Sequence, residues 1–211
     1  MKTMKVGIPT GFQYALIYIS SIILQRVVNG FGEAVIGAFT ATIQIEMLVQ
    51  QIFTSVGTAV VTYTGQNIGT GKTERVSLGV KAAMKISAVS SVILIAVFWI
   101  FGKEIMSVFV SNEEIISIAA VGIKITSLFL ISLGGVQILR YMLNGAGDSI
   151  YALLNGGVEV VSRVAFAIGL TAIPFIGMRG IWLTTGLTWT VTALFAVIRY
   201  KKGTWKLKKL V

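Results

Sequence analysis

One segment limits what this chain can fold into. Residues 34–63 form a run that is long enough and apolar enough to cross a bilayer as a helix. The run nevertheless carries a carboxylate, Glu46, together with Gln44, Gln50 and Gln51. A glutamate that faced lipid at this depth would be strongly unfavourable. The side of the helix that bears Glu46 is therefore predicted to face other protein or a water-filled cavity.

The polar residues of this segment recur at helical spacing. Residues four apart stack on a slowly winding ridge of a helix. One interpretation is that the ridge lines a polar pathway. The other is that its side chains form hydrogen bonds to neighbouring helices, as Gln and Thr commonly do in bundles. The threonines favour the second interpretation, and both stay open for the glutamate. The ridge consists of Glu46, Gln50, Thr54, Thr58 and Thr62.

The composition is that of a multi-pass membrane protein. Of the 211 residues, 55% are hydrophobic and 12% are charged, about half the charged fraction of a typical soluble domain. We predict an all-α fold, a single bundle of six transmembrane helices, followed by a basic cytoplasmic tail at residues 199–211. The predicted spans are about 6–28, 34–63, 80–101, 115–143, 150–173 and 181–198.

The residue types that are missing narrow the function. The chain contains no cysteine and no histidine, which removes thiolate metal sites and catalysis by Ser–His or Cys–His pairs. We therefore predict that the chain is not an enzyme and that it holds no metal and no resident cofactor.

The basic residues indicate how the chain is oriented. The net charge is +10, but Lys and Arg collect at the ends of apolar spans, so nucleic acid is not an expected partner. With a cytoplasmic N-terminus, only Arg26, Lys103 and Arg179 lie at outer ends of spans, and most other basic residues lie at cytoplasmic ends. The positive-inside rule therefore predicts that both termini are cytoplasmic, in a cell membrane whose lipid is one partner.

Polar groups inside the other spans supply further candidates. Glu159 and Arg163 lie four apart on one helix face, with the acid first, and are predicted to neutralise one another as a structural ion pair. Arg140 is assigned to the cytoplasmic end of the fourth span. The candidates for binding a substrate or a cation are Glu46, Gln50, Gln51, Gln13, Lys124 and Gln137.

Three pieces of the sequence, in this order, resemble one transporter family. Residues 7–13 (GIPTGFQ) open the first span. Residues 43–51 (IQIEMLVQQ) are continued by residues 62–71 (TYTGQNIGTG), and residues 143–148 (LNGAGD) separate the fourth and fifth spans. The combination is similar to the carboxy-terminal half of the MATE family of multidrug and toxin extrusion transporters, over nearly the whole chain.

The resemblance implies an architecture and an activity. MATE proteins have twelve helices in two six-helix bundles that face each other across a central cavity. They exchange cationic or amphipathic compounds for Na⁺ or H⁺ by alternating access. This chain would supply the carboxy-terminal lobe in a bacterial membrane. Its partner would be a second six-helix lobe, either a missing amino-terminal half or another copy.

The sequence departs from part of the family pattern. Some members carry coupling carboxylates on the first and fourth helices of this half, whereas here the first span has no acid and the fourth has none in its membrane core. Glu46 is the strongest local candidate for that role. Two alternatives remain open. One is a flippase of lipid-linked precursors, which would line its cavity with several cations such as Lys124 and Arg163. The other is a truncated bundle with no transport activity.

Overall fold

The computed structural model describes the backbone of residues 2–207 and, of these, the side chains of residues 7–148, 150–151 and 153–206. Within residues 2–207 the chain is helical and has no strand, so the predicted all-α fold is confirmed. The α-helices are α1 (Lys2–Val28), α2 (Glu33–Gly69), α3 (Thr73–Ser107), α4 (Glu113–Ser127), α5 (Leu130–Gly145), α6 (Ser149–Thr171) and α7 (Arg179–Lys202), and the 3₁₀ turns are η1 (Asn29–Phe31) and η2 (Thr204–Leu207).

The helix ends follow from local sequence chemistry. The turn between α2 and α3 contains Gly71 at φ 75°, and α7 ends at Gly203 at φ 68°, a left-handed conformation that only glycine adopts readily. Asn112 caps α4 by accepting hydrogen bonds from the backbone N–H groups of Glu114 and Ile115. The predicted tail at 199–211 begins within α7, continues through η2, and at residues 208–211 lies outside the described residues.

Five helices within the described residues are long and apolar enough to cross a membrane, and α4 with α5 forms a sixth candidate span that is bent by 54°. The predicted fourth span at 115–143 is therefore two helices. The break lies at Phe129, whose φ of −102° and ψ of 8° leave the helical region. Its ring packs where a Cβ would stand on Gly186 of α7. The break interrupts the backbone hydrogen bonds of the helix. Near it, the hydroxyl of Ser127 donates a hydrogen bond of 2.7 Å to the backbone carbonyl of Lys124.

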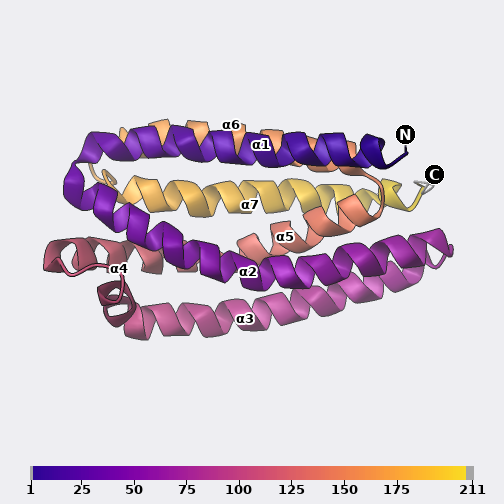
Figure 1. The fold of residues 1–211 in the computed structure, drawn as a ribbon, viewed down its shortest axis with the longest axis horizontal. Coiled ribbons are helices and arrows are strands. Elements are labelled where there is room, and N and C mark those ends of the chain that lie inside the picture. The colour runs from indigo at the N-terminus through magenta and orange to yellow at the C-terminus, as the bar shows by residue number, and fades with distance from the viewer. Residues whose placement is uncertain (1, 208–211) are drawn as a thin grey trace.

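The helices form two groups, which α5 and, to a smaller extent, α4 join by packing against α7. In one group α1 packs along α6, and α6 packs along α7; in the other, α2 packs against α3, α4 and α5. Helix α5 lies between α2 and α7 and contacts both (Figure 1). Although α1 and α2 are consecutive in the chain, they pack on different partners and scarcely touch. The gap between them is bridged at only one end of the bundle.

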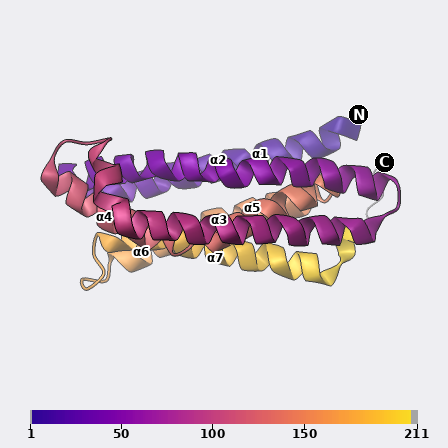
Figure 2. The ribbon, with the colours of Figure 1, turned by 90° about the horizontal axis from the view of Figure 1, so that it is seen from below.

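Both described chain ends and the α2–α3 turn lie at the same end of the bundle, in both views (Figures 1 and 2). The opposite end carries the α1–α2, α3–α4 and α6–α7 connections. Basic side chains accumulate at the first end, in the α2–α3 turn and the last turn of α7. The arrangement agrees with the charge asymmetry on which the predicted orientation depends.

The packing beside the gap is fixed by a buried tryptophan. The Trp182 ring on α7 is fully buried and occupies the space where a side chain on Gly122 of α4 would stand. Its indole N–H donates a hydrogen bond of 3.0 Å to the hydroxyl of Thr42 on α2. One aromatic residue on α7 therefore contacts both α2 and α4 and fixes how these three helices pack.

Candidate functional site

A cavity of about 490 Å³ lies between α1, α2, α5, α6 and α7. It is open to the outside of the bundle, because Tyr18, Met47 and Gln51 on its lining are exposed. The polar and charged residues on its wall are Tyr14, Tyr18, Ser21, Glu46, Gln50, Gln51, Thr54, Gln137, Arg140, Tyr141, Glu159, Arg163 and Thr185.

The cavity unites most of the residues that the sequence singled out. Glu46, Gln50 and Gln51 come from α2, Gln137 comes from α5, and the predicted ion pair comes from α6. These positions are far apart in the chain, but all of them line the cavity between α1 and α2. The structure therefore makes one site from groups that the sequence could present only as separate candidates.

Two of the candidates lie elsewhere. Gln13 of α1 is fully buried against Gly156 of α6, and neither its amide nitrogen nor its amide oxygen has a hydrogen-bond partner among the described residues. Lys124 of α4 packs its stem against Gly102 of α3. Neither residue lines the cavity, so the structure separates both of them from Glu46.

The ridge on α2 leaves the cavity after Thr54. Each step of four residues rotates the position by about 40° around the helix, so Thr58 and Thr62 point outward and are exposed. Their hydroxyls donate to backbone carbonyls of the same helix, at 2.9 Å and 3.2 Å. The expected hydrogen bonds to neighbouring helices are therefore not made by these two threonines.

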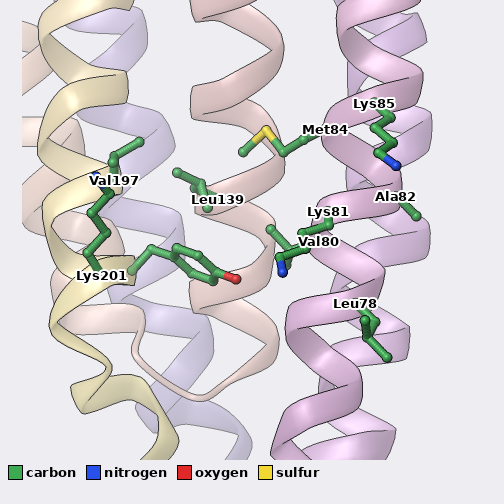
Figure 3. Close-up of a pocket in the computed structure, with 10 residues that line it drawn as sticks. Leu78, Val80, Lys81, Ala82, Met84, Lys85, Leu139, Val197 and Lys201 are labelled. Atoms are coloured by element: carbon green, nitrogen blue, oxygen red, sulfur yellow. The ribbon is translucent and has the colours of Figure 1, made fainter.

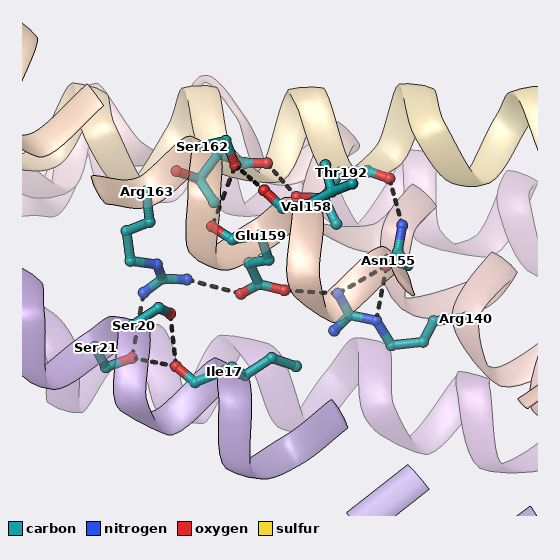
Figure 4. A network of polar contacts seen from close by, with 11 residues as sticks. Ile17, Ser20, Ser21, Arg140, Asn155, Val158, Glu159, Ser162, Arg163 and Thr192 are labelled. Atoms are coloured by element: carbon teal, nitrogen blue, oxygen red, sulfur yellow. Dashed lines mark hydrogen bonds and ion pairs between the residues drawn. The ribbon is translucent and has the colours of Figure 1, made fainter. Parts of the chain in front are cut away.

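A network of buried charges forms the α6 wall of the cavity (Figure 4). One carboxylate oxygen of Glu159 lies 2.6 Å from Nη2 of Arg140, and the other lies 2.8 Å from Nη2 of Arg163. Arg140 also donates to the side-chain oxygen of Asn155 at 3.2 Å and 3.0 Å, and Asn155 donates to the carbonyl of Thr192 at 2.9 Å. Glu159 thus has both oxygens occupied.

Glu46 forms the contrasting wall on α2. Its side chain is buried, and it lies next to the Thr126 hydroxyl and within electrostatic range of Arg163. Among the described residues it has no ion-pair partner. Gln50, one turn away, is half-buried, and Gln51 is exposed. Glu46 is therefore a carboxylate that borders the cavity without being neutralised by a direct contact.

Comparison with known proteins now adds the family. A family model described as MatE matches residues 9–169. The chain belongs to the MATE family. MATE proteins are multi-pass membrane proteins, and the bundle of apolar helices in this chain agrees with that.

Similar MATE proteins include the "Probable multidrug resistance protein YpnP" of Bacillus subtilis (strain 168), 28% identical over 208 residues, which are 98% of this chain and 46% of that protein. "Probable multidrug resistance protein YoeA" of the same organism is 25% identical over 98% of this chain and 45% of its own length. A solved structure described as "MATE in the bent conformation" has a TM-score of 0.89 at 20% identity, and covers 100% of this chain and 47% of that one. The chain spans about half the length of the curated relatives it matches.

Arg140 and Asn155 belong to the buried network beside this cavity, and the sequence did not predict a role in the site for either of them. Arg140 was assigned to the end of a span, but its side chain lies on the wall of the cavity and is 5% exposed. Asn155 had a recognisable signal, because Asn155, Glu159 and Arg163 are each four apart and share one face of α6. A search for polar residues at that spacing would have found it.

The net charge of the cavity wall depends on whether Glu46 is ionised. Arg140 and Arg163 share a single acid, Glu159, so this network carries one positive charge in excess. Glu46 is the other acid on the wall of the cavity, and its ionisation would bring the sum to zero. Within the described residues no group of three or more His, Cys, Asp or Glu side chains is placed to hold a metal ion. Glu46 is therefore the acid of this cavity that is not already paired with an arginine among the described residues.

Proposed function

We propose that this chain is the carboxy-terminal lobe of a transporter that extrudes cationic or amphipathic compounds in exchange for Na⁺ or H⁺. One observation carries the proposal: Glu46 is a buried carboxylate on the wall of an open cavity inside a membrane bundle, and among the described residues it has no ion-pair partner. Placing an ionisable side chain inside the membrane costs free energy, and such residues are usually functional. The relatives that are named probable multidrug resistance proteins support the substrate class.

The charge balance of the cavity suggests how exchange would work. When Glu46 is ionised, it offsets the excess positive charge of the Arg140–Glu159–Arg163 network, and a cationic compound can be held beside it. When Glu46 takes up a proton or Na⁺, the excess positive charge is no longer offset and disfavours an organic cation in the same space. The coupling ion and the substrate then compete for one carboxylate, which couples the movement of one to the movement of the other.

The open side of the cavity calls for a second lobe. A polar wall that faces lipid is unfavourable, and transporters built from repeats bind their substrates between two halves. The chain spans about half the length of its matched relatives. We propose that an amino-terminal lobe, or a second copy of this bundle, covers the gap between α1 and α2.

The test is Glu46→Gln in the complete transporter, with the second lobe restored or co-expressed. This change keeps the size and hydrogen bonding of the side chain but removes its ionisation. Efflux of a fluorescent organic cation from everted vesicles is followed against pH and against Na⁺. We expect the variant to lose most of the efflux and all of its dependence on the coupling ion.

The matched control is Glu104→Gln, which removes one carboxylate from an exposed position near the end of α3. We expect it to transport normally. Unchanged efflux and an unchanged pH profile in Glu46→Gln would refute the role of Glu46. Absence of efflux in the unaltered complete transporter would favour a bundle that does not transport.

One observation favours the flippase alternative: two arginines lie in the cavity. A lipid-linked anionic precursor would need cations that are free to bind it, whereas Arg140 and Arg163 both bind Glu159. The two functions are distinguished by substrate. Translocation of an anionic lipid-linked sugar that survives Glu46→Gln, with no efflux of organic cations, would support the flippase.

A further inference from the structure

A second cavity, of about 600 Å³, lies on another side of α5, between α3, α5 and α7 (Figure 3). It shares no lining residue with the polar cavity. Its floor is apolar: Val80 and Leu139 are buried there, and Met84 and Val197 lie partly buried beside them. The space is shaped by hydrocarbon side chains and is not part of the proposed transport site.

Three lysines surround this apolar floor. Lys81 and Lys85 lie one turn apart on α3, and Lys201 lies across the groove on α7. All three are exposed, and none forms an ion pair among the described residues. No acidic residue lines the groove. Three positive charges therefore surround one apolar groove, and no acidic residue among the described residues pairs with them.

The groove lies where a membrane surface would cross the bundle. Lys81 is eight residues from the start of α3 at Thr73, or about 12 Å along the helix, and Lys201 is in the last turn of α7. Trp205, which follows α7, and Tyr200, which lines the groove, stack on each other. Aromatic and basic residues are typical of this interfacial depth.

We infer that this groove is a binding site for an anionic phospholipid. The phosphate would lie among Lys81, Lys85 and Lys201, because ammonium groups bind phosphate oxygens through charge-assisted hydrogen bonds. One acyl chain would lie along the floor formed by Val80 and Leu139. A zwitterionic lipid fits less well, since its own cation would stand among three lysines. Charge complementarity thus selects the headgroup, and the apolar floor selects a lipid over a soluble anion.

Such a lipid would join the two groups of helices. Lys81 and Lys85 belong to the group of α2, α3, α4 and α5, whereas Lys201 belongs to the group of α1, α6 and α7. Beneath the groove the two groups meet through α5. A phosphate held by lysines of both groups adds a connection at the basic end of the bundle. The bound lipid is therefore expected to raise the thermal stability of the protein.

The test measures lipid retention by the purified full chain in neutral detergent. Phosphatidylglycerol and phosphatidylcholine with the same acyl chains are titrated, and bound lipid is counted by native mass spectrometry alongside the melting temperature. The variant is Lys81→Gln/Lys85→Gln/Lys201→Gln. Each basic residue near a membrane surface contributes roughly fivefold to the binding of anionic lipid. We therefore expect about a hundredfold loss of affinity for phosphatidylglycerol and little change for phosphatidylcholine.

The matched control is Lys72→Gln/Arg75→Gln/Lys202→Gln. It removes the same number of charges from exposed positions at the same end of the bundle, but none of them lines the groove. We expect it to retain phosphatidylglycerol within a few-fold of the unaltered chain. Equal losses in the two triple variants would overturn the site in favour of a diffuse surface charge.

A second variant tests the apolar half of the site. Ala82 lines the groove and is exposed, so Ala82→Phe fills the space with all three lysines kept. We expect this change to reduce phosphatidylglycerol binding as well. Unchanged binding, equal binding of phosphatidylcholine by the unaltered chain, or displacement of the lipid by inorganic phosphate would each overturn the inference. Circular dichroism checks that every variant keeps its helical content.

Discussion

Two glutamates of one cavity are held in opposite ways. On the α6 wall, Glu159 has a guanidinium on each carboxylate oxygen, at 2.6 Å and 2.8 Å. On the α2 wall, Glu46 is also buried but has no ion-pair partner among the described residues. Removing one partner of a buried ion pair is costly, because it leaves the other charge buried and uncompensated. A buried acid without such a partner remains available to an ion or a substrate.

The residues around each acid explain the difference. Glu159 is followed by Arg163 four residues later on the same helix and meets Arg140 from α5. Glu46 is followed at the same spacing by Gln50, whose amide carries no charge. The comparison teaches that depth in the membrane does not assign a role to a carboxylate. The two acids differ in the charge of their neighbours, and the following experiments change either those neighbours or the acids themselves.

The largest loss of stability is expected from Arg140→Ala. The change leaves one oxygen of Glu159 and the side-chain oxygen of Asn155 without a donor. Breaking a buried pair in this way typically costs about 3–5 kcal/mol of the free energy of unfolding. Unfolding in mixed micelles measures the loss. Arg75→Ala, an exposed residue at the start of α3, is the control and should change stability by about 0.5 kcal/mol or less.

Arg163→Ala is expected to cost less, about 1.5–3 kcal/mol, because Glu159 keeps Arg140. If Glu159 paired with Arg163 alone, as their spacing predicts, removing both residues would be less damaging than removing Arg163 by itself. The structure reverses that expectation, since the double variant leaves Arg140 buried without an acid. A double-mutant cycle on these positions measures the coupling. A double variant more stable than Arg163→Ala would show that Arg140 does not need Glu159.

Glu46→Gln should remove transport with little loss of stability, because the amide keeps the size and hydrogen bonding of the side chain and no ion pair among the described residues is broken. Glu159→Gln, its counterpart on the other wall, should be destabilising because two guanidinium groups lose their acid. The same unfolding assay applied to both variants compares the two walls directly. If Glu46→Gln destabilised the protein as much as Glu159→Gln does, the division between an available acid and a structural acid would fail.

The smallest effect is expected from single cysteine substitutions, which test the side of the membrane that each end of the bundle faces. The sequence has no cysteine, so single cysteines can be placed at Thr70 and Ser111, which are exposed at opposite ends of the bundle. Neither change should alter stability. With cytoplasmic termini, an impermeant thiol reagent added to intact cells should label Ser111→Cys but leave Thr70→Cys unlabelled. The opposite pattern would invert the topology.

Much of this protein followed from local patterns. The apolar runs predicted an all-α bundle, because a backbone in lipid must satisfy its hydrogen bonds within each segment. The spacing of Glu159 and Arg163 placed them on one helix face, and the carboxylate in residues 34–63 predicted a polar wall. These inferences succeed because helical periodicity relates residues that are only a few positions apart.

Only the tertiary structure decided which of these groups share a site. Arg140, which the sequence placed at a helix end, lines the cavity and binds one carboxylate oxygen of Glu159. Gln13 and Lys124 are as polar as Gln50, yet packing turns them toward other helices. The lysines of α3 and α7 line one groove because both helices pack against α5. A sequence fixes the face of a helix on which each residue stands, but the direction of that face depends on how helices distant in the chain pack together.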